Sequence, residues 1–268
     1  MKLARPSLSV GLLLAAALVH SPAHAAWDFV PTAAEWQSWP AYCRAQYASV
    51  DHEATFEVST ILPADMVDEW RRTVGQQTFI HLHHFCASIH FLNRARFEPD
   101  RQKRQYNLER ARSDATYTFV RADPQCVVYP AIAVTLAQVL VETGKPDEAE
   151  QFLQKSIQAQ PRRPEPYLML ALLRRKAHKL AEARDILRQA DEATDRKSVD
   201  IQYNLGLISA ELGDFDDAVA NAKKAYAKGY PLPGLKEKLR KVGHWSAADD
   251  SAVAASVAAG GDPSAVKP

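Results

Sequence analysis

The sequence predicts an all-α fold: a superhelix of stacked helix–turn–helix units, with an N-terminal helical extension and a C-terminal capping helix. After Pro130, helical segments alternate with short breakers, at Gly144-Lys145-Pro146, Ala177-His178-Lys179 and Gly213-Asp214. Small residues recur in register across these segments. Ala149 and Ala183 are 34 residues apart, and Ala183 and Ala218 are 35 residues apart. A fixed period of this length is typical of stacked helical hairpins.

Residues 1–25 are predicted to be a secretory signal peptide. Lys2 and Arg5 give a positive start, the run from Leu8 to Val19 carries no charge, and Ala23-His24-Ala25 supplies small residues for cleavage. The apolar run is too short to span a bilayer comfortably, which favours a cleaved signal over a membrane anchor. We therefore expect a periplasmic or secreted protein.

The charge balance of the mature chain argues against nucleic-acid binding. Cleavage would remove Lys2 and Arg5 and no acidic residue, leaving a net charge of −1. Nucleic-acid-binding domains carry a basic excess instead. No later stretch reaches 18 apolar residues, so the mature chain is expected to have no transmembrane span.

Residues 26–128 are predicted to form an N-terminal helical region. Thr32 and Glu35 have the spacing of a capping box. A short helix lies between Pro63 and Gly75, and residues 76–95 contain no breaker and should form one helix. A longer helix follows Pro99 and ends near Pro124. These last two helices are expected to form a hairpin that extends the stack.

The chain has three cysteines: Cys43, Cys86 and Cys126. Export makes disulfides possible, and one pair with one leftover cysteine is the simplest arrangement. Cys43 and Cys86 are the favoured pair because both lie before the repeats, in apolar and aromatic-rich helices. The alternative is three buried free thiols.

A histidine-rich segment, FIHLHHFCASIHF at residues 79–91, is the main candidate for chemistry. At about 100° per residue, His81 and His84 share one side of a helix, while His83, Cys86 and His90 share another. One reading is a metal- or haem-handling site built from His81, His84, Cys86 and His90. The favoured reading is structural, with ring N–H groups bonded to carbonyls or carboxylates. Neither C-x-x-C-H nor H-E-x-x-H is present, so we expect no cofactor and no metal.

A basic cluster follows the histidines. It consists of Arg94, Arg96, Arg101, Lys103 and Arg104, and it is interleaved with Glu98 and Asp100. A solvated helix face explains this pattern better than an anionic partner site does.

The three segments after Pro130 also agree at their packing positions. Leu136, Leu170 and Leu205 correspond, as do the small residues that let two helices cross closely, namely Ala137, Ala171 and Gly206. The stretch from Tyr203 to Pro231, YNLGLISAELGDFDDAVANAKKAYAKGYP, closely resembles the tetratricopeptide repeat. The resemblance covers about residues 130–231, although His178 stands where the family usually has glycine.

The resemblance implies a binding face. In proteins with this repeat, the first helices of the hairpins line a concave surface that binds peptides or partner proteins. Alignment with the repeat places these residues there: Gln138, Glu142, Leu172, Arg175, Lys176 and Tyr203. Neither G-x-S-x-G nor a phosphate-binding loop occurs in the sequence. We therefore expect a non-enzymatic scaffold for a protein or peptide partner in the cell envelope.

The repeats and their cap are predicted to span residues 129–245. Leu235, Leu239 and Val242 lie on one helical face, as expected of a helix that closes a stack of repeats. Residues 246–268 lack aromatic side chains and are expected to be mostly disordered, with ADDSAVAASVAA partly helical.

Overall fold

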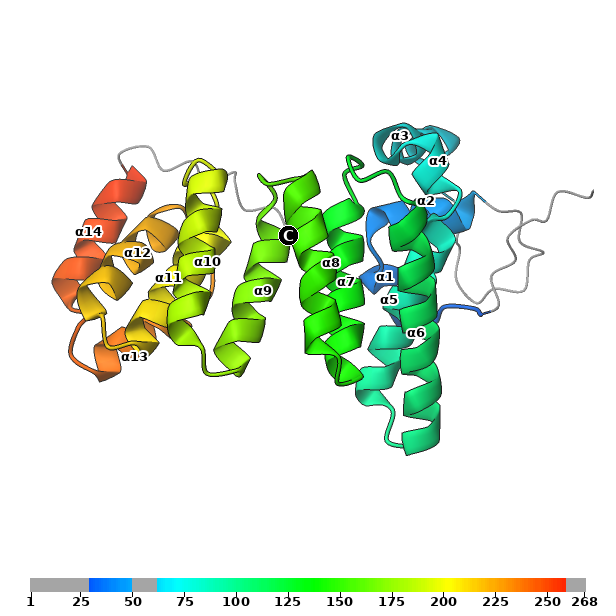
Figure 1. The fold of residues 1–268 in the computed structure, drawn as a ribbon. Helices are drawn as coiled ribbons and strands as arrows, with labels where there is room; N and C mark the ends of the chain where they lie inside the picture. Colours follow the sequence, from blue (N-terminus) through cyan, green and yellow to red (C-terminus); the bar gives the residue numbers. More distant parts are fainter. Residues whose placement is uncertain (1–28, 50–61, 259–268) are drawn as a thin grey trace, which may run out of the picture.

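The computed structural model describes residues 29–49 and 62–258, and this part of the chain contains fourteen helices and no strand (Figure 1). The all-α prediction is therefore confirmed. The predicted signal at residues 1–25 lies outside the described residues. Among the described helices, none is long and apolar enough to cross a membrane.

Four short helices form the N-terminal extension: α1 (Ala33–Ser38), α2 (Ala41–Ala48), α3 (Ala64–Val74) and α4 (Gln76–Phe79). The predicted capping box opens α1, because the Thr32 side chain accepts from the backbone of Glu35 and the Glu35 side chain accepts from the backbone of Thr32. Gly75 ends α3 with a φ of 87°, which is unfavourable for any other residue.

A disulfide joins this extension to the rest of the molecule. Cys43 of α2 is bonded to Cys86 of α5 (Leu82–Phe97), with the Cα atoms 5.5 Å apart. The predicted pairing is confirmed. Cys126 is a buried free thiol.

The prediction of a single helix over residues 76–95 is wrong. The chain turns at Ile80 and His81, between α4 and α5. Nδ1 of His83 donates a hydrogen bond to the carbonyl of Ile80 at 3.0 Å, while the backbone N–H of His84 bonds to His81 instead. The His83 side chain thus competes with the backbone for the Ile80 carbonyl, and the helix is interrupted without Gly or Pro.

Four hairpins follow one another along the stack (Figure 1). The first pairs α5 with α6 (Arg101–Arg121). The next three are the predicted repeats, α7 (Tyr129–Glu142) with α8 (Pro146–Ala159), α9 (Pro164–Lys176) with α10 (Leu180–Ala193), and α11 (Val199–Glu211) with α12 (Phe215–Ala227). The aligned small residues Ala149, Ala183 and Ala218 are fully buried, so the register read from the sequence is correct.

The turns inside the repeats share one backbone conformation. Gly144 and Gly213 have φ values of 77° and 79°, and His178, at the corresponding position, has 59°. The left-handed region costs a residue with a side chain about 1–2 kcal/mol. This backbone conformation explains why the family usually has glycine at the position. His178 adopts the same conformation at an energetic cost.

The longer spacing of 35 residues arises between the second and third repeats. Asp195 and Arg196 both have positive φ there, at 54° and 58°. The Arg196 carbonyl accepts hydrogen bonds from the side chains of Gln202 at 2.7 Å and Lys228 at 2.8 Å. These two bonds hold the extra residue in place between α10 and α11.

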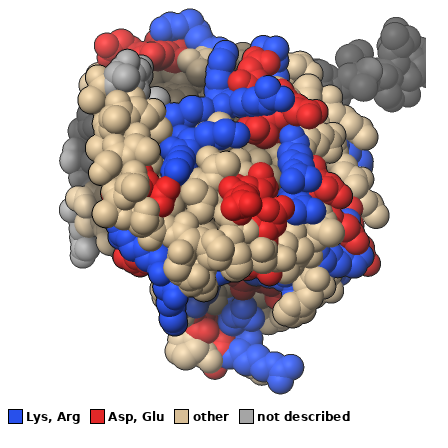
Figure 2. Space-filling model, turned by 90° about the vertical axis from the view of Figure 1, so that its left-hand side faces the viewer, with Lys and Arg blue, Asp and Glu red and all other residues tan. Residues whose placement is uncertain are grey.

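The capping helix α13 (Gly234–Lys241) buries Leu235 and Leu239 completely. Val242, which the sequence placed on the same face, is 48% exposed, because the helix ends before it. Figure 2, a view from this end of the stack, shows Lys and Arg side chains lying beside Asp and Glu side chains, without one dominant sign.

The tail segment expected to be partly helical lies almost entirely in α14 (Ala247–Ala258), which is helical throughout. This helix packs against α12, with Lys223 Nζ 2.7 Å from Asp249 and the Trp245 indole N–H donating to Asp250 at 3.1 Å. Polar contacts and a local helical preference position it, rather than buried side chains. Residues 259–268 lie outside the described part.

Candidate functional site

The residues predicted to bind a partner fall into three structural environments. Leu172 and Lys176, one turn apart on α9, are exposed; the exposed fraction of Leu172 is 38%. Lys176 forms no ion pair with any described residue. These two side chains are therefore available to a ligand.

Gln138 and Glu142, both on α7, are connected to the preceding hairpin. The Glu142 carboxylate accepts from Arg104 at 2.6 Å and from Arg96 at 3.5 Å, and Arg96 also donates to the Gln138 amide oxygen at 3.1 Å. These contacts join α7 to α5 and α6. The side chains of Gln138 and Glu142 thus already make hydrogen bonds within the fold, although both remain partly exposed.

Arg175 connects three parts of the stack. Its guanidinium donates two hydrogen bonds to Glu211 of α11, at 2.8 and 2.5 Å, and Lys238 of α13 donates to the same carboxylate at 3.0 Å. Burial alone would raise the pKa of Glu211, but the bonds from Arg175 and Lys238 outweigh it and lower that pKa. Arg175, which the repeat alignment placed on the binding face, therefore also helps to hold α9, α11 and α13 together.

Tyr203 was expected to line the binding face, but the structure buries its side chain. Its side chain is only 7% exposed, and its ring stacks on Tyr230 with the centroids 3.9 Å apart. The residues that follow α12 return over α11 and cover the ring. Tyr203 therefore packs the end of the stack.

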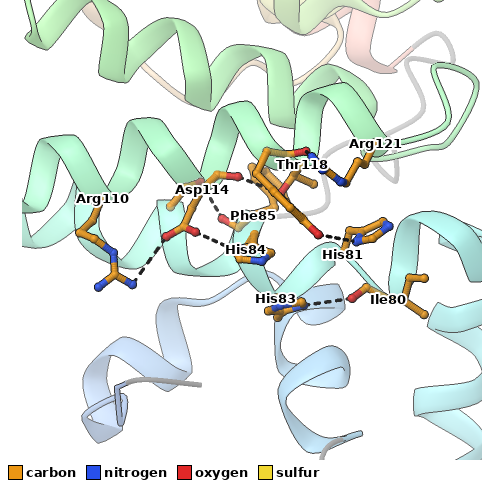
Figure 3. A network of polar contacts seen from close by, with 11 residues as sticks. Ile80, His81, His83, His84, Phe85, Arg110, Asp114, Thr118 and Arg121 are labelled. Carbon is orange, nitrogen blue, oxygen red and sulfur yellow. Dashed lines mark hydrogen bonds and ion pairs between the residues drawn. The ribbon is translucent and has the colours of Figure 1, made fainter. Parts of the chain in front are cut away.

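His81 and His84 lie against α6, whereas His83 turns towards Ile80 (Figure 3). Nδ1 of His84 is 2.6 Å from Oδ1 of Asp114, whose other oxygen is 3.9 Å from Arg110. Nδ1 of His81 is 3.3 Å from the hydroxyl of Tyr117. His81 and His84 thus share one side, as predicted, and both bond to side chains of α6.

The other two proposed ligands lie elsewhere. Cys86 is in the disulfide, and the fully buried His90 ring stacks on Phe29 at 3.8 Å, with Nδ1 3.4 Å from the Glu35 carboxylate. The fold therefore does not bring together His81, His84, Cys86 and His90. The described residues contain no cluster of three or more His, Cys, Asp or Glu side chains arranged to hold a metal.

His83 should make the protein less stable in acid. Burial, together with the charge of the neighbouring His84, lowers the pKa of His83 from 6.5 to about 4. Since the unfolded chain then binds more protons between these values, stability should fall as the pH drops from 6.5 towards 4. Replacing His83 with Gln should flatten this part of a plot of melting temperature against pH.

A matched variant makes this test specific. His178→Asn removes an exposed histidine at a left-handed position that Asn tolerates, and it should leave the acid slope unchanged. An unchanged slope in His83→Gln would show that His83 titrates normally in the folded protein.

Sequence reasoning missed a cleft of about 840 Å³ formed by α1, α5 and α6. It is lined by acidic, basic, amide and aromatic side chains: Glu35, Ser38, Asn93, Arg94, Arg96, Phe97, Glu98, Lys103, Tyr106 and Asn107. The basic cluster noted in the sequence was the available signal, because Arg94, Arg96 and Lys103 all belong to it. The aromatic and amide groups gave no pattern of their own.

The stacked hairpins define a helical-repeat protein, whose neighbouring units share their packing surfaces. Two sequence models of the tetratricopeptide repeat match the chain, at residues 105–173 and 199–227. The chain therefore carries tetratricopeptide repeats over these segments. The first match begins within α6, earlier than the predicted start at residue 130. A comparison with curated proteins found no match.

Proposed function

We propose that this protein is a scaffold of the bacterial cell envelope that binds an extended segment of a partner protein across its first repeat helices, α7, α9 and α11. Tetratricopeptide repeats suggest a protein-interaction scaffold, and proteins built from them are in general not enzymes. The observation that carries the proposal is the exposed pair on α9, where an apolar and a cationic side chain lie one turn apart.

The surroundings of this pair favour a peptide ligand. Leu172 offers an apolar contact, and Lys176 offers an uncompensated charge to an acidic side chain or a carboxyl terminus. Gln138 and Glu142 supply further polar groups on α7, the helix of the preceding repeat that packs against α9. A small apolar centre with a polar surround is typical of protein-binding surfaces.

The proposed location rests on two observations. The first 25 residues have the composition of a secretory signal, and the protein contains a disulfide. Disulfides persist mainly in oxidising compartments such as the periplasm. Fractionation of cells producing the full chain would test this, and recovery of uncleaved protein in the cytosol would contradict it.

The binding proposal predicts that Leu172→Glu combined with Lys176→Glu weakens partner binding by about tenfold or more, which is about 1.4 kcal/mol. Unlike Arg175, neither residue connects two helices, so stability should change by less than about 0.5 kcal/mol. Partners would be identified with a photocrosslinking amino acid at position 172 in intact cells. Affinity would then be measured with the purified partner.

The matched control is Val257→Glu combined with Lys224→Glu. It makes the same change in charge on exposed residues of α14 and α12, away from α9. The control should bind like the wild type. Equal binding by both double variants would show that the partner contacts another surface.

A further inference from the structure

The cleft beside α1 lies at the tip of the longest hairpin. Helix α6 has 21 residues, whereas the helices of the three repeats have 13 or 14. The α5–α6 turn therefore projects beyond the neighbouring hairpin, at the lower right of Figure 1. Two aromatic side chains stay uncovered there, since Phe97 is 87% exposed and Tyr106 is 54% exposed.

An amide side chain that makes no hydrogen bond within the described fold faces this cleft. Asn107 on α6 lines the cleft and is only 9% exposed, yet its side chain makes no hydrogen bond to any described residue. The amide nitrogen and oxygen of Asn107 nevertheless remain accessible, so a ligand in the cleft can reach them. An amide side chain offers both a donor and an acceptor, which complements a peptide bond. Asn93, on the facing helix, lines the same cleft.

The charges of the cleft favour a ligand with few negative charges. Three cations line it, and two are already occupied: Arg94 pairs with Glu35 at 3.0 Å, and Arg96 pairs with Glu142. Lys103 forms no ion pair within the described residues. Glu98 adds a further carboxylate. A single acidic side chain fits this balance, whereas the carboxylates would repel the continuous phosphates of a nucleic acid.

We propose that this cleft is a second docking site, for a short peptide segment in which an acidic residue adjoins an aromatic one. The inference rests on the proposed function, because it takes the partner to be a protein. Asn107 bonds to the peptide backbone, Lys103 pairs with the acidic side chain, and Phe97 and Tyr106 contact the aromatic ring. Exposed aromatic side chains are frequent anchors of protein interfaces.

The test is selection of peptides from a random display library on the full mature protein. We expect the enriched sequences to place Asp or Glu beside an aromatic residue. Synthetic copies should lose about tenfold in affinity when the acid becomes its amide or the ring becomes alanine. Asn107→Leu and Lys103→Glu should cause similar losses, and Lys224→Glu on α12 should cause none.

Asn107→Leu also separates binding from folding. Asn107 makes no hydrogen bond within the described fold and its amide is accessible, so an apolar side chain of similar size should leave the melting temperature nearly unchanged. A variant that is at least as stable as the wild type but has lost the peptide supports a binding role. Loss of binding with a lower melting temperature would instead indicate a structural role and overturn the proposal.

The remaining outcomes distinguish the two proposals. The selected peptides should still bind the Leu172→Glu, Lys176→Glu variant. The cleft proposal is overturned if no peptide is enriched, or if Asn107→Leu and Lys103→Glu leave peptide binding intact. Crosslinking from position 172 tests the proposed binding across α7, α9 and α11 separately. Binding of a single-stranded oligonucleotide that Lys103→Glu abolishes would also overturn it, in favour of a nucleic-acid site.

Discussion

Replacing Cys43 and Cys86 together with alanine is expected to lower the free energy of unfolding by about 4 kcal/mol. The disulfide joins residues 43 positions apart, and its loss frees a long loop in the unfolded chain. It also removes the covalent connection between α2 and α5. Urea unfolding followed by tryptophan fluorescence suits this measurement, because Trp36 and Trp39 are buried in the N-terminal extension.

Two further samples control this result. Cys126→Ala removes the free thiol and only a small buried volume. The free energy of unfolding should therefore stay within about 1 kcal/mol of the wild-type value. The wild type in excess reductant should unfold like the double variant. If reduction changed neither the midpoint nor the slope of unfolding, the disulfide would not contribute to the stability of this protein.

Replacing Gly206 with valine is expected to cost about 3 kcal/mol, through overpacking where α11 crosses α12 and α13. A Cβ atom at this position would lie 2.5 Å from Cδ2 of Leu235 and 3.2 Å from the backbone oxygen of Ala218. Leu235 could rotate away, but it is fully buried, and the backbone of α12 cannot move independently. Thermal unfolding monitored by circular dichroism would report the loss.

The control is Asn204→Val, two residues earlier on the same helix. Asn204 bonds only to the carbonyl of Asp200 within α11 and is partly exposed. Asn204→Val introduces the same β-branched residue at a position away from the helix crossing. We expect it to lower the free energy of unfolding by less than about 1 kcal/mol. If both variants unfolded alike, helix propensity and not the close approach at Gly206 would set the stability.

Much of the candidate site was outside the reach of sequence reasoning. Leu172 and Lys176 were found through the repeat alignment, because a periodic fold repeats the direction of its side chains. The same alignment selected Arg175, yet its guanidinium is already paired with Glu211 of the next repeat. Asn107 carried no signal at all, since no motif or period marks an amide that lines a cleft between α1, α5 and α6.

The sequence by itself determined the helical class, the repeat register, the capping box at Thr32 and the left-handed turns at Gly144 and Gly213. These features depend on side chains and backbone preferences within a few residues. Only the tertiary structure decided the burial of Tyr203 and the docking of α14. The break at Ile80 comes from a local hydrogen bond of His83 that no motif in the sequence marks. The burial and the docking depend on contacts that form after helices have packed: Tyr230 stacks on Tyr203 of α11, and Lys223 of α12 pairs with Asp249. Such contacts compete with local preferences by only a few kcal/mol, and no period or motif in the sequence records which of them prevails.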